Sequence, residues 1–497
     1  MSTSARSANA AALARRALLF LLFAWIVRLL ASWLLTRLHL PTVPVLAGSD
    51  DIFADSIKSG LAERAVTAPL LTDPKVMHWP ALFQRYLFHN KYLAPNMSIY
   101  WEPPLGVFQL MGVGRIMVIA SPWAALATEL AIYGLGVAAF AWLLRRLDAI
   151  STRAAVALAL PMCLSYPALF MLDRGNFHSG FASLCLAAYF CTAVSGRWRW
   201  IGVAALCYSI NVRPNTAVVA LVELVLAKDL NSAIRMAVII AVTSGIIFGC
   251  SLLIVHQIDP DYTFARFVRA YALYKKRYII DGFGFGWNDS LYGAVQVLRL
   301  MFGLLPTYSP VASRAVSALG AMSLLGFVWL AVGGRLRRGE AFFAAAAFCV
   351  LFTPVYAQYH ILIFAGVLAV LTLESAQGAR RPSLAWAWPG LVLFIATGCM
   401  ADLAPTPGLA LLLMLSVAFF ILRLHAEEGG DMITVVSLLV LAPLGGPYAN
   451  GVLIAGLLAT AMLALFVRGA RRPVGTAGPV VARVQWRIQP AVRAYRG

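Results

Sequence analysis

Apolar segments about as long as a bilayer is thick recur along most of the chain, and short polar connectors separate them. A helix that crosses a membrane needs about 20 apolar residues, so each such segment predicts a spanning helix. The candidates lie at 17–38, 123–144, 154–172, 178–195, 200–213, 215–228, 235–256, 311–333, 341–357, 360–375, 384–402, 408–424, 432–447 and 450–467. The short pair over 200–228 is also consistent with a re-entrant hairpin. The pattern predicts an all-α polytopic membrane protein with about 12–14 spans.

Two long polar segments interrupt this pattern, over 39–122 and 257–310. Within the first, residues 103–120 are apolar but short, carry Arg115 and open with two prolines, so we expect an interfacial helix there. We expect both segments to be extracytoplasmic loops, and long loops usually carry function. Residues 1–467 then form a single integral membrane domain, and 468–497 form a basic cytoplasmic tail.

Composition excludes a soluble protein. Hydrophobic residues make up 61% of the chain and charged residues only 12%, whereas soluble domains carry about 25% charged residues. The mean hydropathy is +0.79. The seven cysteines lie in or beside apolar segments and show no metal-ligand spacing, so we interpret them as small apolar residues. We expect no metal and no cofactor.

The net charge of +19 does not indicate nucleic-acid binding, because the basic residues occupy short connectors. These residues are Arg145, Arg146, Arg153, Arg197, Arg199, Arg335, Arg337, Arg338, Arg380, Arg381, Arg468, Arg471 and Arg472. Cytoplasmic loops of membrane proteins show this bias, and such loops attract anionic lipids. The rule places the N-terminus and the tail inside, and it places 39–122, the turn at 173–178 and 257–310 outside. We expect a bacterial inner-membrane protein whose site faces the periplasm.

The first loop is rich in carboxylates: Asp50, Asp51, Asp55, Glu63, Asp73 and Glu102. Asp50 and Asp51 are adjacent just beyond the first span, and like charges at that distance raise the pKa of one of them. A carboxylate there can act as general base toward a sugar hydroxyl. The alternative is that both are solvated loop acids.

Two further groups carry charge where lipid makes charge costly. Asp173, Arg174 and Asn176 lie at the outer end of a span, where ionisable groups favour function, although a capping ion pair also explains them. Arg213 lies in an apolar stretch before Pro214, which breaks the helix. Its guanidinium suits a phosphate; a snorkelling arginine is the alternative.

Three weaker candidates lie later in the chain. Lys275 and Lys276 form a basic cluster that lipid headgroups alone would explain. Asn288 and Asp289 follow an aromatic, glycine-rich run that suggests a flexible loop over a site. His360 lies between two spans, either as a hydrogen-bonded core residue or as a donor to a phosphate.

Six short segments, in this order, resemble the polyprenol-phosphate-dependent mannosyltransferases of the GT-C class, which include the mycobacterial alpha-1,2-mannosyltransferases of phosphatidylinositol mannosides. They are SDDIF at 49–53, YWEPP at 100–104, RGN at 174–176, RP at 213–214, NDSL at 288–291, and TP at 353–354 followed by His360. Arg213 replaces the family's lysine, and Tyr359 stands in place of one histidine of its pair. Residues 384–467 show no matching motif.

The resemblance implies a GT-C-like fold and an inverting transfer of mannose or a related sugar. The donor would be a polyprenyl-phosphate-linked sugar, and the acceptor a hydroxyl of a glycolipid or glycan on the outer face. Asp51 or Asp50 would be the base. The phosphate would be held by Arg213 and His360, with Arg174, Lys275 or Lys276 as further candidates. A lipid or sugar transporter or flippase is the runner-up, and a non-catalytic scaffold comes third.

Overall fold

The computed structural model describes residues 70–88, 102–148, 150–193, 198–227, 229–276, 288–304, 308–353, 358–377 and 447–474, with scattered positions between 11 and 61. Every regular element within these residues is a helix, which agrees with the predicted all-α class. The predicted spans 384–402 and 408–424, and nearly all of 432–447, lie outside the described residues, as do Asp50 and Asp51.

Four helices in the described part are long and apolar enough to cross a membrane. They are α6 (Pro122–Asp148), α13 (Leu230–Ile258), α16 (Pro310–Val332) and α22 (Pro447–Arg471). Large apolar side chains on α6, α13 and α16 are exposed. A soluble protein rarely exposes a long apolar face, whereas lipid accommodates one. α22 continues to Arg471, four residues past the predicted end of the membrane domain at 467.

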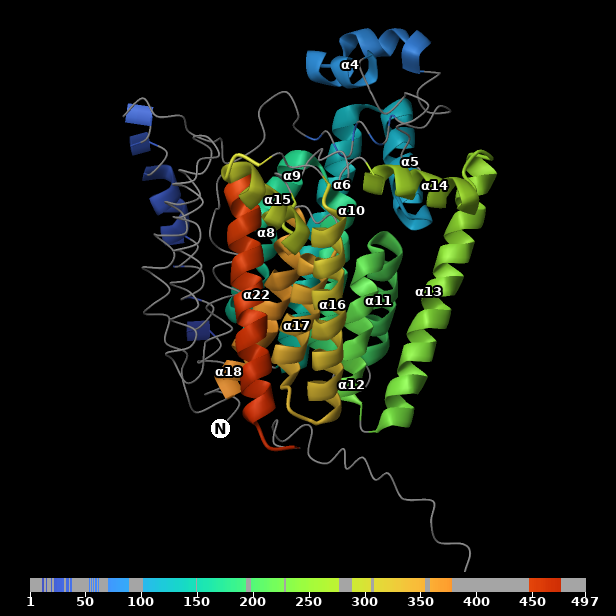
Figure 1. The fold of residues 1–497 in the computed structure, drawn as a ribbon. Coiled ribbons are helices and arrows are strands. Elements are labelled where there is room, and N and C mark those ends of the chain that lie inside the picture. The colour runs from blue at the N-terminus through green and yellow to red at the C-terminus, as the bar shows by residue number, and fades with distance from the viewer. Residues whose placement is uncertain are drawn as a thin grey trace, which may run out of the picture.

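Shorter apolar helices fill the interior of the bundle (Figure 1). α10 (Phe177–Thr192) packs against α11 (Arg199–Val212) and α18 (Ile363–Gln377). A Cβ atom added at Gly366 of α18 would lie 2.6 Å from Cβ of Ala187 on α10. Small residues let helices approach closely in membranes, where packing replaces the hydrophobic effect as the driving force.

Helix breaks occur at two places in the apolar segments, one within the span predicted over 154–172 and one between the spans predicted over 200–213 and 215–228. In place of one helix over 154–172, the chain forms α7 (Thr152–Ala159), α8 (Pro161–Leu164) and α9 (Tyr166–Arg174), with a bend of 49° before α9. Proline lacks the amide N–H that a continuous helix needs, and Pro161 and Pro167 lie at the two breaks.

The second break follows Arg213. Residues Pro214–Val222 form the 3₁₀ helix η4, which continues into the short α12 (Glu223–Leu226). A 3₁₀ helix of nine residues is unusual because its hydrogen-bond geometry is poor, and such stretches often mark functional hinges. α11 and η4 together form the short hairpin predicted over 200–228.

The first polar segment contains helices that lie at one end of the bundle. They are η1 (Pro74–His78), α4 (Ala81–Phe88) and α5 (Pro104–Ile119). α5 matches the helix predicted over 103–120 and packs against α6, α11 and α13. The hydroxyl of Tyr262 donates a 2.8 Å hydrogen bond to the carbonyl oxygen of Glu102, just before α5.

The second polar segment is more ordered than a loop. It contains α14 (Phe264–Lys275) and α15 (Leu291–Met301). α15 packs against α22 and α16. The side chains of Tyr292, Val297 and Met301 on this helix are buried. The amphipathic pattern of both helices explains why mean hydropathy alone did not reveal them.

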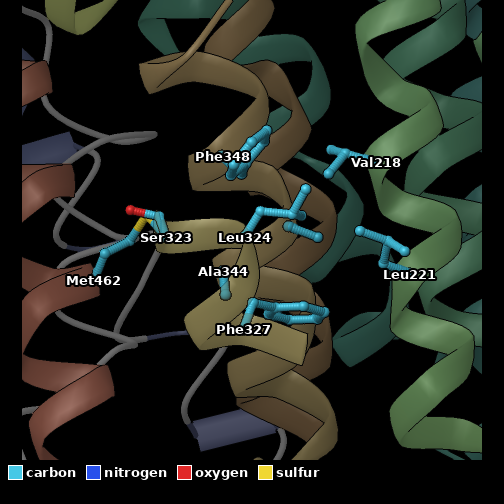
Figure 2. A pocket seen from close by; sticks show the side chains of 9 residues that line it. Val218, Leu221, Ser323, Leu324, Phe327, Ala344, Phe348 and Met462 are labelled. Atoms are coloured by element: carbon cyan, nitrogen blue, oxygen red, sulfur yellow. The ribbon is translucent and has the colours of Figure 1, made fainter. Parts of the chain in front are cut away.

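An apolar crevice opens between η4, α16, α17 (Arg338–Leu351) and α22 (Figure 2). Ser323 supplies the only polar side chain among the residues that line it, which are Val218, Leu221, Ser323, Leu324, Phe327, Ala344, Ala345, Phe348 and Met462. With one hydroxyl and no ionisable group, the crevice cannot support acid–base chemistry.

Arg335, Arg338 and Arg472 lie at the end of the bundle where α22 ends. Nε of Arg338, at the start of α17, lies 2.8 Å from the carboxylate of Glu374 near the end of α18. The guanidinium of Arg472 donates two hydrogen bonds, of 2.6 and 2.7 Å, to Glu340. These bonds fix the end of α22 against the start of α17. We call this end of the bundle the basic end.

Breaking the Arg472–Glu340 pair should destabilise the fold. Burial alone would raise the pKa of Glu340, but the hydrogen bonds and charge of Arg472 outweigh it and lower that pKa below its ordinary value of 4.5. The pair therefore contributes stability above pH 4.5 and loses it as the pH falls through the lowered pKa. Glu340→Gln should cost roughly 1–3 kcal/mol at neutral pH, and the cost should shrink below pH 4.5. Thermal melting in detergent measures both effects.

Asp261→Asn is the matched control for that measurement. It breaks the ion pair between Asp261 and Arg266, whose side chains are 76% and 40% exposed. Exposed pairs contribute little, so its melting temperature should stay close to that of the wild type. Equal shifts for the two variants would contradict the stabilising role assigned to Glu340.

Candidate functional site

The tight turn between α9 and α10 brings polar side chains together at the end of the bundle opposite the basic end. Gly175 adopts a left-handed conformation with φ of 71°, which glycine adopts at no steric cost. The amide of Asn176 then donates a 2.9 Å hydrogen bond to the carbonyl of Met171, closing a Schellman-type end to α9. Arg174 and Asn176 consequently lie on either side of Gly175 in this turn.

The first loop is attached to this turn through Asp55. Nη2 of Arg174 lies 2.6 Å from Oδ1 of Asp55, and Nδ2 of Asn176 donates a 3.2 Å hydrogen bond to Oδ2. The amide of Phe53 also donates a 2.6 Å hydrogen bond to the carbonyl of Asp173. Phe53 has a φ of 57°. A positive φ is rare for a bulky residue, and residues held in such conformations cluster at functional sites.

Asp55 was not among the predicted site residues, although the sequence held a signal for it. It is one of the six carboxylates of the first polar segment, and residues 55, 57 and 59 are helical. Asp50 and Asp51 lie outside the described residues, so their role as base stays a prediction. Asp55 is the first-loop carboxylate that the described contacts bring to the turn.

Arg213 reaches the same turn from α11. Its Nη2 lies 3.4 Å from Oδ1 of Asn176 and also donates to the hydroxyl of Ser179. The Ser179 hydroxyl in turn donates to Oδ1 of Asn176. Nε of Arg213 is buried, and no described residue accepts a hydrogen bond from it. The predicted cation is therefore brought to Asn176 and still holds a donor for a further acceptor.

Two histidines complete this group of side chains. His178 lies in the first turn of α10 and is 7% exposed. His360 lies in η7 (Gln358–Leu362), which packs against α9 and α10. Both imidazole rings are close enough to Arg213 for its charge to act on them. We call Asp55, Arg174, Asn176, His178, Ser179, Arg213 and His360 the turn cluster.

The break after Arg213 is also fixed to the rest of the bundle. Nδ2 of Asn215 donates a 3.2 Å hydrogen bond to the hydroxyl of Thr353, just beyond α17. The hydroxyl of Thr216 donates a 2.7 Å hydrogen bond to the carbonyl of Arg213. These bonds hold the backbone of Arg213 at the start of η4, so its side chain enters the turn cluster from a fixed position.

The remaining predicted residues lie in other surroundings. Asn288 and Asp289 precede α15 and pack against α22, where a Cβ atom added at Gly451 would lie 2.9 Å from the carbonyl oxygen of Asn288. Burial raises the pKa of Asp289 well above its ordinary value. Asp173 is buried beside the turn.

The lysine cluster lies at the end of α14. Lys276 is exposed, and the side chain of Lys275 is not described. α14 contacts α13 through aromatic rings, with the ring centroids of Phe248 and Phe264 6.1 Å apart.

Within the described residues, no group of three or more histidine, cysteine, aspartate or glutamate side chains has the arrangement needed to hold a metal ion. The turn cluster instead offers guanidinium, imidazole, amide and hydroxyl donors beside one carboxylate. Donors of this kind suit an oxyanion such as phosphate. No protein-family model, no curated protein and no solved structure matches this chain.

Proposed function

We propose that the protein is an inverting glycosyltransferase with a GT-C-like fold. It would move mannose or a related sugar from a polyprenyl-phosphate donor to a hydroxyl of a glycolipid or glycan. The observation that carries the proposal is the turn cluster, in which Arg213 from within an apolar stretch and Asp55 from the first polar loop meet at Asn176. Anion-binding groups and a loop rich in carboxylates are thus attached to one turn.

A lipid-linked phosphate suits this position for a physical reason. Charged groups within apolar segments are costly and usually bind substrates or ions. Arg213 directly follows α11, the 14-residue helix that begins at Arg199, so the two arginines lie about 20 Å apart along the helix axis at the helical rise. Arg199 belongs to the basic end, where its partner is Glu223. If that end faces the cytoplasm, as the charge rule expects, the turn cluster faces the outer surface.

The reaction would proceed in one displacement. The acceptor hydroxyl oxygen attacks the anomeric carbon of the sugar and forms the new C–O bond, while the bond from that carbon to the phosphate oxygen breaks. The electron pair of the broken bond leaves with the phosphate, giving a polyprenyl monophosphate. The hydroxyl proton passes to a carboxylate, for which we propose Asp51. Arg213 and His360 would stabilise the charge that grows on the phosphate.

A transporter or flippase is the second candidate, and two specific observations favour it. Transporters bind their substrates at discontinuous helices, and this bundle contains both the 49° bend before α9 and the 3₁₀ helix η4. However, the turn cluster lies at the ends of α9, α10 and α11, whereas transporter sites lie near the middle of the bilayer.

The two candidates give different products in one experiment. The full chain is purified and reconstituted into proteoliposomes with polyprenyl phosphate carrying radiolabelled mannose, and then other hexoses, together with a bacterial lipid extract as acceptor. Transfer produces a labelled glycolipid and unlabelled polyprenyl monophosphate. A flippase changes which leaflet holds the donor and leaves the donor intact. Intact donor in both leaflets, with no labelled glycolipid for any hexose, would exclude the proposed transfer.

A further inference from the structure

The N-terminus of α10 is not capped by its own N-cap side chain. Asn176 holds the N-cap position, and its side chain makes no cap hydrogen bond. Its Oδ1, the atom that could accept from the first turn, accepts from Ser179 and Arg213 instead. The first backbone N–H groups of a helix have no partner within the helix. Within the described residues, those of the first turn of α10 therefore remain available to an anion.

His178 lies in that same first turn. It is 7% exposed, and within the described part of the chain neither of its ring nitrogens has a hydrogen-bond partner. Leaving a buried polar group unpaired costs about 1–3 kcal/mol, so such groups in a native protein call for an explanation. A ligand that accepts a hydrogen bond from the imidazole provides one.

Positive charge from the helix dipole and from Arg213 meets at the first turn of α10. The first turn of a helix carries about half a positive charge from the aligned peptide dipoles. Arg213 adds a guanidinium that donates to Ser179 in the same turn. The carboxylate of Asp55 is paired with Arg174, and that of Asp173 is buried at the end of α9. Helix N-termini with this charge and free amides bind phosphate groups.

We propose that the first turn of α10, with His178 and Arg213, is a phosphate site that prefers a phosphate monoester dianion to a phosphodiester monoanion. The proposal rests on the proposed function, in which the donor is a diester and the leaving lipid a monoester. A site complementary to the monoester stabilises the charge that develops during transfer and not the ground state. Interactions of that kind are the ones that raise the rate.

This preference has a consequence for regulation. The product lipid should bind more tightly than the donor and inhibit the protein until it leaves. The class of reaction that must follow is one that removes or recharges the polyprenyl monophosphate, because its accumulation would occupy the first turn of α10.

The test measures binding without requiring any sugar transfer. The full chain in nanodiscs is titrated with farnesyl phosphate, with its methyl ester, and with inorganic phosphate. The monoester should bind about tenfold more tightly than the methyl ester, because the ester lacks one charge and one strong acceptor oxygen. The affinity for inorganic phosphate measures how much of the monoester's affinity comes from its headgroup alone. Equal affinity for the monoester and its methyl ester would overturn the proposal.

Variants in the first turn separate ligand binding from folding. His178→Phe removes the ring donor and should weaken monoester binding by about tenfold, whereas His178→Gln keeps an N–H donor and should restore most of the affinity. Ser179→Asp puts a carboxylate where the anion would bind. It should abolish monoester binding while the melting temperature holds or rises, because acids stabilise helix N-termini.

His78→Phe is the control, since it removes an exposed imidazole in η1 and should leave binding unchanged. Unchanged monoester affinity in both His178→Phe and Ser179→Asp would overturn the proposed site. The experiments also distinguish a failure of the proposed phosphate site from a failure of the proposed glycosyltransferase function. Monoester binding at α10 without any sugar transfer would contradict the glycosyltransferase and leave the site standing. Transfer at wild-type rates by His178→Phe would contradict the site alone.

Discussion

Arg213→Gln is expected to lower the rate of sugar transfer by about a hundredfold or more, which is the usual loss when one fixed donor to a developing oxyanion is removed. The guanidinium has two donating edges in this cluster. Nη2 is engaged by Asn176 and Ser179, whereas Nε is buried without a partner in the described part. Glutamine is neutral and cannot supply both edges. The measurement is single-turnover transfer from a saturating polyprenyl-phosphate donor.

Two further variants serve as a comparison and a control for Arg213→Gln. Arg213→Lys keeps the charge but loses the planar fork of donors, so its rate should fall between those of wild type and Arg213→Gln. Arg115→Gln removes an exposed arginine on α5 and should transfer at the wild-type rate. If Arg213→Gln folds and transfers as fast as Arg115→Gln, Arg213 is a snorkelling residue and does not contact the phosphate.

The long helices were predictable because hydropathy alone determines them. α6, α13 and α16 coincide with the spans predicted over 123–144, 235–256 and 311–333. Each is an apolar run that no internal proline interrupts. In such a run every backbone group can be satisfied within the helix, which is what lipid requires.

The breaks and the amphipathic helices were harder to predict. Mean hydropathy does not register the missing N–H of Pro161 or Pro167, so the bend before α9 was not expected. α14 has its apolar residues at Phe264, Phe267, Val268 and Tyr271, the spacing of one helix face. Averaging over a window dilutes that face with the intervening polar residues, and the segment then looks like a loop.

The candidate site was predictable only where residue type and position agreed. Arg174, Asn176 and Arg213 are polar residues at the ends of apolar segments, and the structure brings them together. His178 was not singled out as a site residue because a histidine beside a turn has many ordinary roles. The sequence favours the adjacent pair Asp50 and Asp51 over Asp55 as the catalytic carboxylate. Only contacts in the folded structure distinguish among these carboxylates.

Asp51→Asn is expected to abolish transfer and to spare donor binding, because it removes the basic lone pair and keeps the shape of the side chain. A positioned general base contributes about a hundredfold or more. Asp50→Asn should cost less, since it acts only through the electrostatics that the two carboxylates share. Single-turnover rates and donor affinities of both variants, measured side by side, test this.

Asp55 provides the sharpest comparison. Its two oxygens are engaged by Arg174 and Asn176, so these contacts fix its side chain on the turn. We therefore expect Asp55 to be a positioning residue that holds the first loop on the turn. Asp55→Asn should weaken donor or acceptor binding and lower the rate by about tenfold, less than the loss expected for a base.

A double-mutant cycle decides between positioning and catalysis. If Asp55 acts through Arg174, the double variant Asp55→Asn with Arg174→Gln should lose little more than either single variant, because the two residues share one interaction. If Asp55 is the base, the losses should multiply, and Asp51→Asn should retain activity. The same assay therefore assigns the proton acceptor to Asp51 or to Asp55. Wild-type rates in all three aspartate variants, at 50, 51 and 55, would show that no carboxylate of that segment takes the proton.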